Sequence, residues 1–237
     1  MASSAPYQPP TSFAVFPPVV KNLLILNGLA FVAQLIFQAR SGAGIGVVEE
    51  WFALWPAGIP SGEALPAYGG RFWPWQLLTS GFLHGSFSHI LFNMFGLWMF
   101  GGVIERDLGS QRFLFYFLAC VVGASALQVL VVSAPLLFGV GEFAYVPTLG
   151  ASGGVLGVLA AFGLLHPEQK VFLLFIPVPI PARIFVLGYA AIDLFSGLSG
   201  YSTGVAHFAH LGGMLTGVVL LLYWLGRLPV KPRARLA

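Results

Sequence analysis

The stretch RFLFYFLACVVGASALQVLVVSA, residues 112–134, carries no charged side chain after Arg112. An α-helix needs about 20 predominantly apolar residues to cross the hydrocarbon core of a bilayer, and this stretch meets that requirement. The rest of the chain has a similar character: 57% of its 237 residues are hydrophobic and 8% are charged, whereas soluble domains carry about 25% charged side chains. The composition therefore predicts a polytopic membrane protein rather than a water-soluble one.

Further apolar runs of spanning character lie at 19–38, 86–104, 150–166, 182–198 and 205–226, each bounded by charges, prolines or glycines. Together with 112–134 they predict an all-α membrane protein with six transmembrane helices. The run 150–166 is short, because it begins after Pro147 and ends at His166-Pro167. We expect its N-terminal end to lie inside the protein, within reach of water.

The distribution of Lys and Arg predicts which loops face the cytoplasm, because short cytoplasmic loops are enriched in these residues. With the N-terminus inside, only Arg40 and Arg71 fall outside. The inside set is Lys21, Arg106, Arg112, Lys170, Arg183, Arg227, Lys231, Arg233 and Arg235. We expect both termini in the cytoplasm, with 1–17 a short disordered tail, 18–227 a six-helix membrane domain and 228–237 a basic tail.

The segment between the first two spans, about 39–85, is too long for a simple connector. It carries a group of large aromatic side chains, namely Trp51, Phe52, Trp55, Phe72, Trp73 and Trp75. Amphipathic rings favour the headgroup layer of a bilayer. We therefore expect a long, membrane-associated first outer loop.

Charge and cysteine content exclude other classes. The net charge of +3 is small and scattered, so no nucleic-acid partner is expected. The one basic cluster, at 227–235, directly follows an apolar run and is typical of a membrane-flanking anchor. A single cysteine, Cys120, permits no intrachain disulfide and is expected to be a small buried hydrophobe.

The segment Gly150-Ala151-Ser152-Gly153-Gly154 opens the fourth apolar run. Flanking glycines let backbone or substrate approach the Ser152 hydroxyl closely. The spacing also matches the G-x-S-x-G elbow of soluble hydrolases, which requires a preceding strand that this composition does not allow. A purely structural alternative is a small-xxx-small packing seam made by Gly150, Gly154 and Gly157.

His210 lies in the sixth run, in Ala209-His210-Leu211-Gly212-Gly213, and Gly213 and Gly217 are spaced to press that helix against a partner. A histidine within a span usually faces a polar cavity or the bundle interior. It can be a hydrogen-bonded structural residue or the base that a serine nucleophile needs.

The second run begins at His84-Gly85-Ser86-Phe87-Ser88-His89 and continues to Asn93. His89 and Asn93 are four residues apart, so they share one helix face, and both can donate hydrogen bonds to a developing oxyanion. The alternative is that Asn93 bonds a neighbouring helix.

These three motifs, H-x4-H-x3-N, G-x-S-G and A-H-x-G-G, follow one another on the second, fourth and sixth runs. In this order they resemble the rhomboid family of intramembrane serine proteases, over about residues 19–226. The resemblance implies a six-helix bundle whose Ser–His dyad opens to the outer side and cleaves transmembrane substrates near a helix end.

Carried over by position, the resemblance implies that Ser152 is the nucleophile and His210 the general base. His89, Asn93 and the backbone N–H of Ser152 match the oxyanion contributors. Glu105 and Arg106 resemble the family's polar pair at the inner end of the second helix, a structural feature.

The chain departs from the family at two positions. Leu156 stands where an aromatic ring often supports the base, and Trp75-Gln76 stands where the first loop has a Trp-Arg pair. The first departure removes the ring expected to position His210, and the second removes a salt bridge that faces lipid.

Three other polar residues, Asp193, His207 and His84, are expected near the outer face. The family works with a dyad, so Asp193 is expected to be a solvated or locally paired carboxylate rather than a third catalytic group. His207, one turn before His210, is expected to line the mouth of the site or to be structural, and the role of His84 is left open. Four histidines and an aspartate also permit a metal site, but a metal would leave the glycine-flanked serine unexplained, so none is expected.

Three functions compete. The first is a serine endopeptidase that acts on transmembrane protein substrates in contact with membrane lipids, without metal or cofactor. The second is a non-catalytic rhomboid-like binder of membrane clients, although such proteins usually lose the serine or the histidine. The third is a transporter, although the spans hold few charges and no inverted pair of broken helices. We expect the protease, in a bacterial inner (cytoplasmic) membrane.

Overall fold

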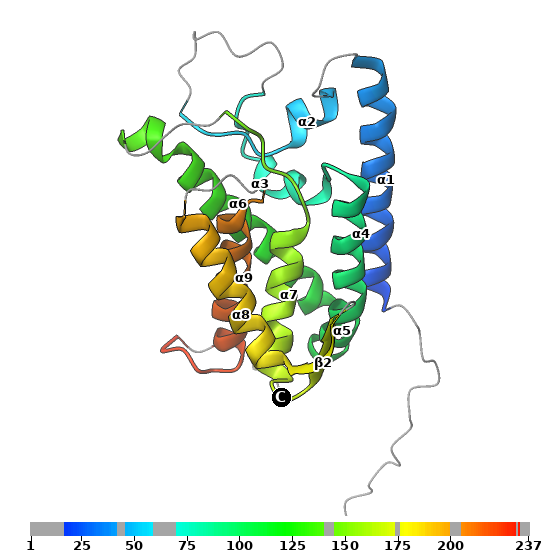
Figure 1. Ribbon diagram of the computed structural model, residues 1–237, viewed down its shortest axis with the longest axis vertical. Coiled ribbons are helices and arrows are strands. Elements are labelled where there is room, and N and C mark those ends of the chain that lie inside the picture. Colours follow the sequence, from blue (N-terminus) through cyan, green and yellow to red (C-terminus); the bar gives the residue numbers. More distant parts are fainter. Residues whose placement is uncertain are drawn as a thin grey trace, which may run out of the picture.

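The computed structural model describes residues 17–41, 46–58, 70–139, 145–173, 176–199, 205–230 and 232, and these residues form a mostly helical bundle (Figure 1). The long elements are α1 (Pro18–Ser41), α4 (Phe87–Gly96) with the π-helical turn η2 (Leu97–Gly101) and α5 (Gly102–Leu108), α6 (Ser110–Phe138), α7 (Ser152–Leu165), α8 (Ala182–Leu198) and α9 (His207–Trp224). The expected disordered tail, 1–17, lies outside the described residues except for Pro17, as does most of the basic tail.

Each of the six apolar runs forms a helix, so the sequence predicted the main elements. Among the described residues, four segments are long and apolar enough to cross a bilayer: Pro18–Gln38, Phe87–Leu108, Ser110–Phe138 and His207–Trp224. The helix α7 has 14 residues and α8 has 17, so both are shorter than those four. The fold is therefore that of a multi-pass helical membrane protein.

The centre of the bundle is α7, which packs against both α6 and α9, and these two also pack against each other (Figure 1). Every residue from Gly153 to Gly163 is buried, as expected for a helix that is apolar on all sides. The Tyr116 hydroxyl on α6 donates a hydrogen bond of 2.8 Å to the Gly157 carbonyl oxygen on α7. In Figure 1 α7 begins well below the upper end of α1, so its N-terminus lies within the bundle.

The segment between α1 and α4, expected to be the first outer loop, contains α2 (Val47–Phe52), α3 (Gln76–Thr79) and the short 3-10 helix η1 (Ser80–Phe82). Trp51, Trp73 and Trp75 stack in a row, with ring centroids 6.5 and 4.9 Å apart, and all three are exposed. Amphipathic rings of this kind favour the headgroup layer, and the contact of this row with the membrane stays a prediction. Trp55 differs, because its ring is fully buried and its indole N–H contacts the carbonyl oxygens of Glu49 and Glu50.

The structure explains why Gln76 follows Trp75 in this loop, where the family has a Trp-Arg pair. Gln76 is fully buried. Its side-chain oxygen accepts hydrogen bonds from the backbone N–H groups of Trp55 and Trp73. Its side-chain nitrogen donates to the backbone carbonyl oxygens of Trp51 and Arg71. In place of a salt bridge facing lipid, this position holds the loop backbone together.

The all-α prediction missed an antiparallel hairpin between α7 and α8. Strand β1 (Lys170–Leu173) pairs with β2 (Ile176–Pro181), with Lys170 opposite Pro181 and Val171 opposite Ile180. The second strand reads IPVPIP, and proline at alternate positions removes the N–H groups that a helix requires. The segment was expected only as a connection between the apolar runs 150–166 and 182–198, and its prolines favour an extended conformation.

The N-terminal turn of α1 is fixed by a carboxylate from α5. Glu105 is 2% exposed and accepts from the backbone N–H groups of Val19 (3.0 Å) and Val20 (2.8 Å) and from the Ser110 hydroxyl (2.7 Å). The first N–H groups of a helix have no partner within the helix. The carboxylate satisfies two of them and so holds three helices at one end of the bundle.

We predict that Glu105→Gln destabilises the protein. The amide keeps one acceptor oxygen but presents an N–H to a backbone donor, and an unsatisfied buried group costs about 1–3 kcal/mol. Unfolding in detergent measures the loss. Glu168→Gln is the control, because that carboxylate is 68% exposed in its pair with Arg183 and an exposed pair contributes about 0–1 kcal/mol. Equal stability of the two variants would contradict the capping role.

Candidate active site

Ser152 and His210 lie in direct contact. The Ser152 hydroxyl oxygen and His210 Nε2 are 2.8 Å apart. Ser152 is the first residue of α7, and His210 is one turn into α9. The residue His210 is 7% exposed. Its Nε2 atom is therefore in contact with the Ser152 hydroxyl rather than with bulk water.

Glycine makes this contact possible by allowing α7 and α9 to approach closely. A Cβ atom added to Gly213 would collide with the carbonyl oxygen of Gly153 on α7, and one added to Gly217 would collide with the Tyr116 hydroxyl. The packing role expected for Gly213 and Gly217 is therefore confirmed.

The packing seam predicted for Gly150, Gly154 and Gly157 is only partly correct. Gly154 and Gly157 pack against Phe117 and Cys120 of α6, but Gly150 lies before the helix with φ +137°. A Cβ atom at Gly150 would come within 2.7 Å of His89 Nε2. This glycine therefore supplies an unusual backbone angle and space for the His89 ring.

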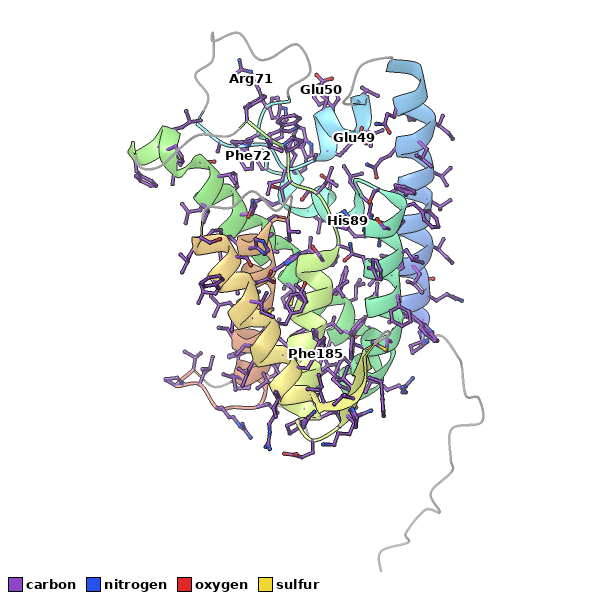
Figure 2. All side chains as sticks on the ribbon, in the orientation of Figure 1. Glu49, Glu50, Arg71, Phe72, His89 and Phe185 are labelled. Atoms are coloured by element: carbon purple, nitrogen blue, oxygen red, sulfur yellow. The ribbon has the colours of Figure 1, made fainter. Side chains whose placement is uncertain are left out.

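A cavity of about 940 Å³ opens beside Ser152. Its lining includes both members of the contact pair, together with His89 and Asn93 of α4 and Tyr189 of α8. Figure 2 shows His89 near the upper end of α4, at the level where α7 begins. The predicted site residues thus meet around one cavity.

Two side-chain donors of α4 border this cavity. The Gly85 N–H donates to His89 Nδ1 at 3.4 Å, which leaves the ring proton on Nε2. Asn93 is 6% exposed, and its side-chain nitrogen is buried without a hydrogen-bond acceptor among the described residues. A buried donor without a partner is costly, and here a ligand in the cavity can supply the acceptor.

The first turn of α4 is held in place by Ser86, whose hydroxyl accepts from the His89 N–H at 3.1 Å. This N-cap fixes the start of the helix and therefore the rotational position of His89 and Asn93. The N-terminus of α7 contributes the free N–H of Ser152 and the positive end of the helix dipole to the same region.

Asp193 on α8 is neither solvated nor remote from the pair. One carboxylate oxygen lies 3.0 Å from His210 Nδ1, and the other lies 2.6 Å from His207 Nδ1. The side chains of Asp193, His210 and His207 are 5%, 9% and 12% exposed. The expectation of a solvated carboxylate is wrong, and that of a locally paired one is confirmed.

This cluster is also the group of described residues best suited to hold a metal. The ligand atoms of Asp193, His207 and His210 all lie within 4.8 Å of one another. Both Nδ1 atoms already contact the carboxylate, however, so the geometry is accounted for without an ion. The absence of a metal stays a prediction.

An aromatic ring does accompany His210, although not from the position where the family often has one. Tyr189 of α8 lies with its ring centroid 6.3 Å from that of His210. Leu156 instead belongs to the buried apolar core. The sequence indicated a missing ring on α7 but gave no sign that α8 supplies one.

His84, whose role was open, is buried behind His89. Its ring is 2% exposed and lies edge-on to His89 at a centroid distance of 5.1 Å. Burial, together with the neighbouring His89, lowers the pKa of His84 to about 4. Its backbone N–H donates to the Gln34 side chain at 2.9 Å. A neutral, buried His84 therefore packs against the ring of His89.

Comparison with known proteins places these residues in a family. A family model described as the rhomboid domain matches residues 71–227. The chain belongs to the rhomboid family. The matched range contains α4, α7 and α9 and therefore all of the cavity residues named above.

Curated relatives carry rhomboid names. The chain is 31% identical over 160 residues to "Rhomboid protein 1, mitochondrial" of Saccharomyces cerevisiae, covering 68% of this chain and 44% of that protein. It is 34% identical over 153 residues to "RHOMBOID-like protein 12, mitochondrial" of Arabidopsis thaliana, covering 60% and 44%. It is 31% identical over 163 residues to the human "Presenilin-associated rhomboid-like protein, mitochondrial", covering 65% and 40%. The match thus spans less than half the length of each of these relatives.

Proposed function

We propose that this chain is an intramembrane serine endopeptidase that cleaves transmembrane protein substrates near the outer membrane face through a Ser–His dyad. The observation that carries the proposal is the 2.8 Å contact between the Ser152 hydroxyl and His210 Nε2 at the edge of a cavity. A serine hydroxyl is a weak nucleophile unless a base accepts its proton. A non-catalytic binder of membrane clients, the alternative function, has no need of this pair.

The residues support acyl transfer in ordinary steps. His210 Nε2 accepts the proton of Ser152 as the hydroxyl oxygen attacks the scissile carbonyl carbon. The tetrahedral intermediate collapses when His210 returns that proton to the leaving amine. Water then attacks the acyl-enzyme with the same histidine as base, and Ser152 is released.

The oxyanion of the intermediate needs donors that are already in place. The side chains of His89 and Asn93 and the backbone N–H of Ser152 are the candidates, and Asn93 has a buried donor without an acceptor among the described residues. Donors fixed before the reaction stabilise developing charge without reorganisation. The negative oxygen would also face the positive end of the α7 dipole.

The same proposal includes six membrane-crossing helices. At 14 residues, α7 is about 21 Å long, which is shorter than a hydrocarbon core of about 30 Å. Its buried sides allow it to end inside the bundle, which sets Ser152 below the outer surface. On α8, the exposed side chains Leu187, Ile192 and Phe195 suit a helix that contacts lipid.

We further propose a bacterial inner-membrane location with both termini cytoplasmic. The asymmetry of Lys and Arg supports this orientation. In Figure 2, Glu50 and Arg71 lie at the end of the bundle that would face outward, and Phe185 lies toward the opposite end. The mitochondrial names belong to the relatives.

Ser152→Ala and His210→Ala should each abolish cleavage of a transmembrane reporter by the purified protein in detergent. The two residues act as one unit, so either loss should remove nearly all of the turnover. A fluorophosphonate should label the wild type but not Ser152→Ala. Ser199→Ala is the control, because that exposed hydroxyl donates only to the Ser196 carbonyl oxygen. Near-normal turnover in either dyad variant would refute the assignment.

Asn93→Ala should lower kcat more than it raises KM, because an oxyanion donor acts chiefly in the transition state. Loss of one such donor typically costs about 10² to 10³ in rate, and His89 and the Ser152 N–H can reduce the effect. Asn27→Ala is a matched control, since Asn27 is a buried asparagine that donates to Leu23 of its own helix. If Asn93→Ala behaved like that control, Asn93 would have no part in stabilising the anion.

The orientation can be tested with two single cysteines in a Cys120→Ser background, at Glu50 and at Glu168, which are both exposed. An impermeant thiol reagent added outside intact cells should label Glu50→Cys and not Glu168→Cys. Permeabilised cells should show both labelled, which controls for reactivity. Reversed labelling would place the mouth of the cavity on the cytoplasmic side.

A further inference from the structure

Asp193 bridges two histidines that belong to the first turn of α9. Its two oxygens face the Nδ1 atoms of His210 and His207, at 3.0 and 2.6 Å. The carboxylate is 5% exposed. In the described part of the chain, no Lys or Arg lies within salt-bridge distance of it, and these two rings are its hydrogen-bond partners.

A buried carboxylate needs hydrogen-bond donors, because burying an unpaired charge is strongly unfavourable. An ionised carboxylate only accepts hydrogen bonds, so each facing Nδ1 must carry a proton. For neutral His210 this leaves Nε2 unprotonated, and that atom faces the Ser152 hydroxyl at 2.8 Å. The bond to Asp193 therefore selects the one tautomer in which His210 can accept the serine proton.

His207 acts on the other oxygen of the same carboxylate. It is not among the residues that line the cavity, so it does not meet the substrate there. Its bond fixes the plane of the carboxylate and hence the direction of the oxygen that faces His210. The separation of three residues on α9 brings both rings to one helix face, where a single side chain from α8 reaches them.

We propose that Asp193 is a positioning residue for His210, and that His207 positions Asp193. The side chains of His207, Asp193, His210 and Ser152 then work as one hydrogen-bonded network. The proposal rests on the serine protease function proposed above. The carboxylate orients the imidazole and stabilises its positive charge while His210 holds the serine proton. No group other than Ser152 is acylated, and Asp193 gains no proton in the reaction.

The first test is Asp193→Asn, which keeps the shape of the side chain and removes its charge. We expect kcat on a transmembrane reporter to fall by about 10² to 10⁴, as for the equivalent change in a serine protease triad, with KM within about threefold because uniform binding is untouched. Asp107→Asn is the matched control. Asp107 also pairs with a histidine, His166, at 2.7 Å, but on α5 and at the other end of α7.

The second test separates positioning from folding. His207→Leu removes the donor, whereas His207→Asn places an amide nitrogen at the same number of bonds from the backbone as Nδ1. We expect kcat to fall about tenfold in the leucine variant, as for loss of one hydrogen bond to a charged group, and to return to within about threefold of wild type in the asparagine variant. Melting in detergent, measured for both, shows whether stability follows the same order.

The inference is supported if the kcat losses occur at near-normal KM and His207→Asn restores turnover. It is overturned if Asp193→Asn matches Asp107→Asn in kcat, or if both His207 variants lose activity in proportion to lost stability. The failure of the protease function is a different result. In that case the wild type would neither cleave the reporter nor take up fluorophosphonate at Ser152.

Discussion

The close approach of α7 and α9 is the contact on which the rest of the site depends. Gly213 lies against the Gly153 carbonyl oxygen, where no larger side chain fits. In lipid the hydrophobic effect does not drive helices together, so close packing of small residues supplies much of the free energy of helix association. Because Ser152 and His210 lie one turn or less from these glycines, the packing that joins the helices also sets the 2.8 Å contact between hydroxyl and imidazole.

The same packing determines the depth of the candidate site within the bundle. A helix as short as α7 leaves backbone N–H groups of its first turn unpaired, and such groups are tolerated at membrane depth only beside protein or a water-filled cavity. The cavity next to Ser152 meets this condition. The polar residues around it come from several elements, with His89 and Asn93 on α4 and His210 on α9. The site is thus the place where a short central helix exposes its polar end to its neighbours.

The sequence predicted the fold well wherever apolar length was the deciding property. The run expected at 182–198 coincides with α8, and the other runs agree with their helices to within a few residues. The fourth run began too early because Gly150, counted as helical, has φ +137°. The hairpin β1–β2 was missed because its strands have only four and six residues and lie between two of the apolar runs, where a search for segments of spanning length finds nothing.

For the candidate site, the sequence named the residues that the structure gathers around one cavity, namely Ser152, His210, His89 and Asn93. These residues could be named because their three motifs follow one another on the second, fourth and sixth apolar runs. The partnership of Asp193 could not be found in the same way, because it depends on how far α8 is rotated against α9. The spacing of His207 and His210 was an available signal, since it places both rings on one face, but nothing in the sequence shows which helix that face meets.

Two buried carboxylates show why that rotation matters. Glu105 and Asp193 have the same electrostatic need, since a charge within a membrane bundle must be satisfied by donors. Glu105 takes its donors from backbone N–H groups and a hydroxyl, none of which gains or loses a proton near neutral pH. Asp193 contacts the imidazoles of His207 and His210 instead, and the other ring nitrogen of His210 faces the Ser152 hydroxyl. The contacts of Glu105 therefore join helices at one end of the bundle. Those of Asp193 join α8 to the side chain that faces Ser152, so the rotation of α8 against α9 sets the orientation of that imidazole.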